Sequence, residues 1–238
     1  MKILDDLLLA VGYETMVRDV RQGVFQTAVL TRNCGLASTP PGYSYSGFSV
    51  EGAGLLINKG ALALARMAYS PSLLEAAIGM ATLNSLIEIE DRRCVSLNAS
   101  ALLAEKGRGR KVAMVGYFPF VPELRQEVKE LWVIERHPGE EDFPKDEAKN
   151  LIPQADVVAI TGSAFTNHTI EYLLDFCRPK TYVVVLGPTT PLSPVLFDYG
   201  VDAISGTTVV DTEAVLRCVS QGATFRQVGG VRLLTMKR

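Results

Sequence analysis

Five segments in the second half of the sequence combine the residue types that could bind a small molecule. Each follows an apolar run typical of a strand, and each is small or polar: Gly116, Glu135, Thr161-Gly162, Gly187-Pro188 and Gly206-Thr207. In an open α/β sheet, ligands bind outside the carboxyl ends of the strands. We therefore expect these segments to line one crevice. The pattern predicts a binding site but does not name a reaction.

Two side chains in these regions could transfer protons. Glu135 lies about 19 residues after Gly116, where an acidic residue can hold a ribose hydroxyl. His168 follows Asn167, which we expect to cap a helix, so the histidine should lie in the first helical turn. We take Glu135 and His168 as candidate catalytic residues, with an ordinary surface role as the alternative for each.

The turn from Gly187 to Pro194 could bind an anion. Its free amides and the hydroxyls of Thr189 and Thr190 suit a carboxylate or a phosphate, and a rigid turn is the alternative. A classical dinucleotide site is disfavoured. The turn at 116–122 holds one glycine and bulky aromatic residues, where three glycines would let a pyrophosphate approach the backbone.

These segments need strands and helices to position them, and the second half of the sequence alternates between the two. The runs 157–160 and 182–186 are continuous and β-branched, as expected of strands buried on both faces. Further strands are expected at 112–116, 131–135 and 203–205, with an edge strand at 231–236. Helices are expected at 123–128, near 145–152, at 170–177, and at 212–220 after a capping Asp211. This alternation is typical of a doubly wound parallel sheet.

The first part of the sequence has a different pattern. We expect a helix at 3–11, a hairpin around Gln22-Gly23, a third strand at 34–37, and helices at 61–69 and from 72 to about 88. Ser72 and Glu75 match a capping box at the start of the last helix. Because antiparallel strands differ from the later repeat, we expect an α+β domain at residues 1–106 and an α/β domain at 107–238.

The expected helix at 72–88 carries two informative positions. Gly79 leaves little bulk, so we expect another backbone to pack closely there. Asn84 lies on a largely apolar helix, where it either bonds a neighbouring backbone in the core or reaches the crevice. We predict that it reaches the crevice. The Gly-, Pro- and Tyr-rich segment 38–54 is either a solvated loop or a lid over the crevice, with Tyr43, Tyr45 and Phe48 facing the ligand.

Composition excludes several classes of function. A formal net charge of -2 argues against a general nucleic-acid or membrane surface. The N-terminus lacks the pattern of a signal peptide, so we expect a cytoplasmic protein. The four cysteines show no C-x-x-C spacing and the two histidines are isolated, so we predict no metal site built from side chains. A homo-oligomer is compatible with the sequence, and the sequence leaves the identity of any cofactor unknown.

Four stretches resemble a known family: AAIGMATLNS (76–85), VGYFPFVPELR (115–125), ADVVAITGSAFTNHT (155–169) and the run from VVVLGPTT to GTTVVD (183–211). Their sequences are similar to those of the family "Putative heavy-metal chelation", domain-of-unknown-function family 364. The resemblance implies an enolase-N-terminal-like α+β domain followed by a Rossmann-like domain, with a site in the cleft between them. The positions that match its motifs are Asn84, Gly116, Glu135, Thr161, Gly162, Asn167, Thr169, Gly187, Pro188 and Gly206.

Two functional hypotheses follow. The first is an enzyme that acts on a small polar or metal-chelating molecule in the cleft, with Glu135 and His168 as its acid–base groups. The alternative is a non-catalytic protein that binds such a chelator or its heavy-metal complex. In both cases the partner is a small molecule, and neither nucleic acid nor membrane is expected.

Overall fold

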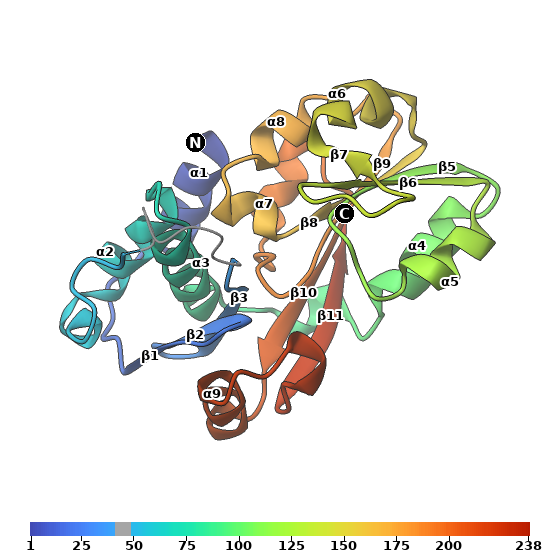
Figure 1. Ribbon diagram of the computed structural model, residues 1–238. Coiled ribbons are helices and arrows are strands. Elements are labelled where there is room, and N and C mark those ends of the chain that lie inside the picture. The colour runs from blue at the N-terminus through green and yellow to red at the C-terminus, as the bar shows by residue number, and fades with distance from the viewer. Residues whose placement is uncertain (41–48) are drawn as a thin grey trace.

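Two β-sheets of different size organise the chain in the computed structural model, which describes residues 1–40 and 49–238 (Figure 1). The small sheet is an antiparallel meander of β1 (Asp19–Gln22), β2 (Gln26–Leu30) and β3 (Cys34–Ser38). The large sheet has eight strands and is mostly parallel. Tyr43, Tyr45 and Phe48, which we expected to face the ligand, lie outside the described residues.

The order of the large sheet decides where its strand ends meet. From edge to edge it runs β4 (Cys94–Val95), β11 (Val231–Lys237), β10 (Ala203–Val209), β9 (Tyr182–Leu186), β8 (Val157–Thr161), β5 (Lys111–Val115), β6 (Glu130–Glu135) and β7 (Phe143–Pro144). The six strands from β5 to β10 are parallel, and β11 and β4 are antiparallel to their neighbours. Strand order reverses between β5 and β8, the place where sheets of this kind bind ligands.

Both faces of the large sheet are buried, which explains its continuous apolar strands. In β8, Val157 and Ala159 join one apolar cluster, and Val158 and Ile160 join another. The first face is covered by α4 (Ala99–Gly107) and α5 (Val121–Glu127). The second face packs against α7 (Ser163–Thr166), α8 (Ile170–Leu174) and the 3₁₀ helix η6 (Pro194–Tyr199). Buried residues of α6 (Ala148–Leu151) and the 3₁₀ helix η5 (Ile152–Gln154) join the same apolar cluster. These two helices follow the 3₁₀ helix η4 (Lys145–Glu147).

The N-terminal part, residues 1–87, packs onto that second face. Its helices are α1 (Lys2–Val11), α2 (Ala61–Ala65) and α3 (Leu73–Leu86), with the 3₁₀ turns η1 (Leu56–Asn58) and η2 (Arg66–Tyr69). Side chains such as Ile3 and Leu83 share one apolar cluster with Ile160 and Leu196. The small sheet therefore lies close to the large one, and α3 packs on one of its faces (Figure 1).

The other face of the small sheet is covered from the far end of the chain. Ala28 and Leu36 pack against Val215 and Val219 of α9 (Thr212–Ser220). Asp211 caps α9 as predicted, its carboxylate accepting from the Ala214 amide at 3.0 Å. After η7 (Phe225–Gln227) the chain returns as β11. The C-terminal segment thus contributes to the core of the small sheet.

Several predicted elements need correction. The expected capping box is wrong, because Ser72 donates to the Ser49 carbonyl and Glu75 accepts from Ser70 and from the Glu51 amide. The helix expected at 61–69 changes to the tighter η2 at residue 66. The last strand is not an edge, because β4 pairs with it after η3 (Asp91–Arg93). β4 belongs to the large sheet and α4, which ends at Gly107, packs against it. Across residues 1–40 and 49–238, every helix is too short or too polar to cross a membrane.

Candidate functional site

The expected strand-end residues form one continuous row across the large sheet. Gly116 after β5 bonds through its amide to Ile134 of β6, Gly162 after β8 to Leu186 of β9, and Gly187 after β9 to Ser205 of β10, at 3.0, 2.7 and 3.0 Å. Each glycine thus extends its strand by one hydrogen bond. We call Gly116, Thr161, Gly162, Gly187 and Pro188 the strand-end row.

Close contacts explain why glycine occupies two positions of the row. A Cβ on Gly116 would lie 2.9 Å from Thr161 Cβ, and Gly116 has a φ of 100°. A Cβ on Gly162 would lie 2.5 Å from Thr190 Oγ1 and 2.6 Å from its amide nitrogen. Gly116 and Thr161 meet where the strand order reverses, between β5 and β8.

The predicted strand end at Gly206-Thr207 needs correction. β10 continues to Val209, so both residues lie within the strand and not after it. Gly206 still contacts the turn after β9, since a Cβ there would lie 3.0 Å from the Thr190 carbonyl oxygen. The turn after β9 therefore contacts the middle of β10 at Thr190.

Asn84 reaches the row from α3. Its amide nitrogen donates to the carbonyl oxygens of Leu36 at 2.8 Å and Thr189 at 3.2 Å. Because both partners only accept, the nitrogen must face them, and Oδ1 points elsewhere. Oδ1 is buried and has no partner among the residues that the structure describes. The same holds for the hydroxyl of Thr190.

Thr189 ties β3 to the same turn. Its side chain is buried, and its hydroxyl accepts from the Ser38 amide at 2.9 Å. The hydroxyl that we expected to bind an anion is therefore engaged by β3. Together with Asn84, this bond joins the N-terminal part to the turn after β9.

Glu135 ends β6 and holds the turn after β5. Oε1 accepts from the Tyr117 amide at 2.6 Å, and Oε2 accepts from the Arg136 amide at 2.9 Å. A carboxylate that accepts two backbone N–H groups fixes local backbone. Its role in proton transfer stays a prediction.

His168 does not lie in the first turn of a helix, and Asn167 is not the cap of that helix. The chain makes the short helix α7, turns, and starts α8 at Ile170 with Thr169 at the cap position. Asn167 Oδ1 accepts from the Thr169 hydroxyl at 2.6 Å, which stabilises the turn. His168 has a φ of 60°, and Nε2 lies 2.8 Å from the Ala68 carbonyl oxygen. Since a carbonyl only accepts, Nε2 carries a proton and donates.

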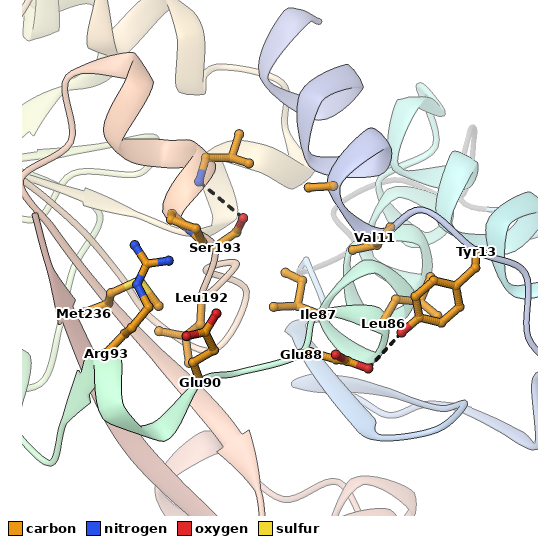
Figure 2. A pocket seen from close by; sticks show the side chains of 13 residues that line it. Val11, Tyr13, Leu86, Ile87, Glu88, Glu90, Arg93, Leu192, Ser193 and Met236 are labelled. Carbon is orange, nitrogen blue, oxygen red and sulfur yellow. Dashed lines mark hydrogen bonds between the residues drawn. The ribbon is translucent and has the colours of Figure 1, made fainter.

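Two cavities lie beside the strand-end row, and the predicted site residues line neither of them. One, of about 580 Å³, is lined by Tyr117, Val121, Pro122, Arg125, Gln126, Gly139, Glu140, Glu141 and Asp142. The other, of about 220 Å³, lies between α1, the end of α3 and the turn after β9 (Figure 2). Both include residues a few positions beyond a strand end, such as Tyr117 and Leu192. A position shortly after a predicted strand is the feature of the sequence that could have located these cavities.

Two family models match the chain and together cover most of it. One, described as "Putative heavy-metal chelation" and known as DUF364, matches residues 98–236. A second, DUF4213, has the same description and matches residues 4–87. The chain belongs to the DUF364 family.

Relatives of this DUF364 protein support the fold. Uncharacterized protein MJ0500 of Methanocaldococcus jannaschii is 28% identical over 169 residues, which are 68% of this chain and 65% of that protein. A DUF364 protein of unknown function from Desulfitobacterium hafniense DCB-2 has a TM-score of 0.86 at 24% identity, covering 100% of this chain and 97% of that one. One from Pyrococcus horikoshii has a TM-score of 0.84 at 20% identity, covering 100% and 98%.

The metal-ligating residue types of this DUF364 protein are dispersed. Within the part of the chain that the structure describes, no three His, Cys, Asp or Glu side chains are grouped so that they could hold a metal ion. Burial raises the pKa of Cys34 and that of Cys177 to about 12, and nearby Asp19 and Asp202 add to the respective shifts. Both thiols are therefore protonated at neutral pH, a form that neither attacks an electrophile nor binds a metal well.

Proposed function

We propose that this DUF364 protein binds a small polar, metal-chelating molecule, or the heavy-metal complex of that molecule, at the strand-end row. In this proposal the large sheet acts as a Rossmann-like sheet and the N-terminal part as an enolase-N-terminal-like module that supplies Asn84. The ligand lies at the reversal of strand order, where Gly116 and Thr161 meet.

The unpartnered oxygen of Asn84 is the observation that carries the proposal. A buried polar atom without a hydrogen bond costs about 1–3 kcal/mol. Asn84 Oδ1 and Thr190 Oγ1 both lack a partner among the described residues, and Asn84 bonds the carbonyl oxygen of Thr189, next to Thr190. A ligand would remove the cost by offering an N–H or O–H group to Oδ1. The expected ligand is therefore a polar molecule that carries at least one donor.

Binding accounts for the geometry better than proton transfer does. Both oxygens of Glu135 accept from backbone amides, and His168 Nε2 donates to a carbonyl. The two side chains expected to act as acid and base, Glu135 and His168, therefore form hydrogen bonds that position the backbone. Since no three metal-ligating side chains are grouped within residues 1–40 and 49–238, the proposal assigns any metal-binding atoms to the ligand.

Mass spectrometry of the purified protein, combined with metal analysis, tests the proposal. We expect a bound small molecule, with or without a metal ion, in near-stoichiometric amount. The informative variant is Thr190→Val, which removes an unpartnered hydroxyl and changes the shape little. Because no hydrogen bond to a described residue is lost, the free energy of unfolding of the ligand-free protein should stay equal or rise by about 1 kcal/mol, while less ligand is retained.

Asn150→Ala is the matched control for Asn84→Ala. Asn150 is an exposed residue of α6 whose amide donates to Glu147, and it does not belong to the strand-end row. We expect Asn84→Ala to lose the bound molecule and Asn150→Ala to keep it. If the Asn84→Ala and Thr190→Val variants retain the bound molecule as well as the wild type does, a site at the strand-end row is excluded.

A further inference from the structure

The cavity of about 220 Å³ beside the turn after β9 is bordered by both parts of the molecule (Figure 2). At about 30 Å³ per water molecule, it holds on the order of seven waters or one small organic molecule. Its apolar wall comes from α1, the end of α3, the turn after β9 and β11, through Val11, Leu86, Ile87, Leu192, Val195 and Met236. Such a wall favours a ligand with an apolar portion.

Among the described side chains around the cavity, the cation of Arg93 has no partner of opposite charge. Glu88 accepts from the Tyr13 hydroxyl at 2.9 Å and pairs with Arg32 at 3.2 Å. Glu90 pairs with Arg92 at 2.9 Å. Arg93 lines the cavity, and its guanidinium makes no ion pair or hydrogen bond within the part of the chain whose side chains the structure describes. A guanidinium without a described partner at the cavity wall therefore favours an anion.

A buried hydroxyl offers a second polar contact. Ser193 is 4% exposed, and its oxygen accepts from the Val195 amide at 3.4 Å. Within the described residues its hydroxyl proton has no acceptor, so it can donate into the cavity. Figure 2 shows Arg93 and Ser193 on one side of the cavity, with Val11 and Ile87 on the other. The polar and apolar parts of a ligand would thus face different walls.

We propose that this cavity is a second ligand site, for a small carboxylate with a short, branched apolar tail. The carboxylate bonds to the Arg93 guanidinium, whose planar donors match its two oxygens, and to the Ser193 hydroxyl. The tail packs between Ile87 and Leu192, from the two parts of the molecule. One free guanidinium suits a singly charged group better than a phosphate. This site is separate from the strand-end row and does not depend on the function proposed there.

Isothermal titration calorimetry with 3-methylbutanoate tests the proposal. Acetate lacks the tail, and 3-methylbutanamide has the same size without the charge. We expect 3-methylbutanoate to bind in the millimolar range or tighter, and both comparison compounds to bind at least about tenfold more weakly.

Two neighbouring arginines give a matched pair of variants. Arg93→Gln should weaken 3-methylbutanoate binding about tenfold or more, because it removes the unpaired cation. Arg92→Gln should weaken binding clearly less than Arg93→Gln, because Arg92 does not line the cavity and affects it only through its ion pair with Glu90. Both side chains are exposed, so both variants should fold. Absence of binding, equal binding of the amide, or equal affinity in Arg93→Gln would overturn the proposal.

Discussion

At the scale of single residues, His168 combines backbone strain with a bond between the two parts of the molecule. Its φ of 60° lies in the left-handed region, which costs an L-residue roughly 1 kcal/mol compared with glycine. Its ring donates to the Ala68 carbonyl oxygen in η2 at 2.8 Å. The strained turn between α7 and α8 is what aims the ring at η2, so the bond offsets the strain.

Two substitutions at His168 separate these effects. His168→Ala loses the bond and keeps the strain, so we expect the free energy of unfolding to fall by about 1–2 kcal/mol. His168→Gly also loses the bond but relieves the strain, so its loss should be smaller by about 0.4–1 kcal/mol. Urea denaturation of both variants at one pH measures the difference. A glycine variant less stable than the alanine variant would contradict the assignment of strain.

Residue types and spacing predicted that the glycines and threonines at the strand ends lie together but not how the neighbouring side chains bond. Gly116 and Thr161 could be placed together because parallel strands end at one edge of a sheet. The partners of Glu135 and His168 could not be predicted, because they are the backbone groups of Tyr117 and Ala68, 18 and 100 residues away. Every residue carries such groups, so sequence offers no signal for which of them a side chain will meet.

At the scale of elements, α3 is approached by other backbone on two sides. On one side, a Cβ on Gly79 would lie 1.9 Å from the Ala68 amide nitrogen of η2. On the other side, a Cβ on Gly35 of β3 would lie 2.1 Å from the Ala81 carbonyl oxygen. The close approach predicted at Gly79 is therefore present. It sets the position of α3, and with it the position of Asn84.

Gly79→Ala should be strongly destabilising for this reason. In an open helix alanine is favoured over glycine, but here the methyl group would meet backbone that cannot move independently. We expect a loss of about 3 kcal/mol or more in the free energy of unfolding, measured by thermal or urea denaturation. Gly229→Ala is the control, because no atom lies within 4 Å of its Cβ position. Similar stability of the two variants would contradict the packing.

Element prediction succeeded where a pattern was long enough and failed where tertiary contacts replaced local ones. β8 and β9 were found because five consecutive residues of each are buried or nearly so. β4 and β7 span two residues each, too short to show a period. The capping box at Ser72 failed because Ser49 and Glu51, more than 20 residues earlier in the chain, bind Ser72 and Glu75.

At the scale of the whole molecule, α1 fastens the N-terminal part to the large-sheet part. The Ile3 amide in the first turn of α1 donates to Glu171 of α8 at 2.8 Å, where a carboxylate also complements the helix dipole. The Tyr199 hydroxyl at the end of η6 donates to Asp6. Contacts at α1, Asn84 and His168 therefore join the same two parts at three places. We infer that they unfold together.

The Tyr199–Asp6 contact makes this joint sensitive to alkaline pH. Partial burial, followed by the hydrogen bond to Asp6, raises the pKa of Tyr199 from 10.0 to about 12. Below pH 10 the phenol is protonated in both the folded and the unfolded state, so the contact contributes fully. As the pH rises from 10 to 12, the unfolded state releases its proton first, which favours unfolding. The stability contributed by Tyr199 is therefore present below about pH 10 and lost as the pH approaches 12.

The Tyr199→Phe variant has no phenol hydroxyl, so it lacks both the hydrogen bond to Asp6 and the group that titrates. We expect the wild type to have the larger free energy of unfolding at pH 9, with the difference between the two proteins shrinking steadily towards pH 12. Urea denaturation at several pH values measures this difference, and general alkaline effects cancel because both proteins share them. Tyr172→Phe is the control, since Tyr172 is 56% exposed and packs on Phe176. If the difference in free energy of unfolding between the wild type and Tyr199→Phe stays constant up to pH 12, the contact with α1 does not hold the proton on Tyr199.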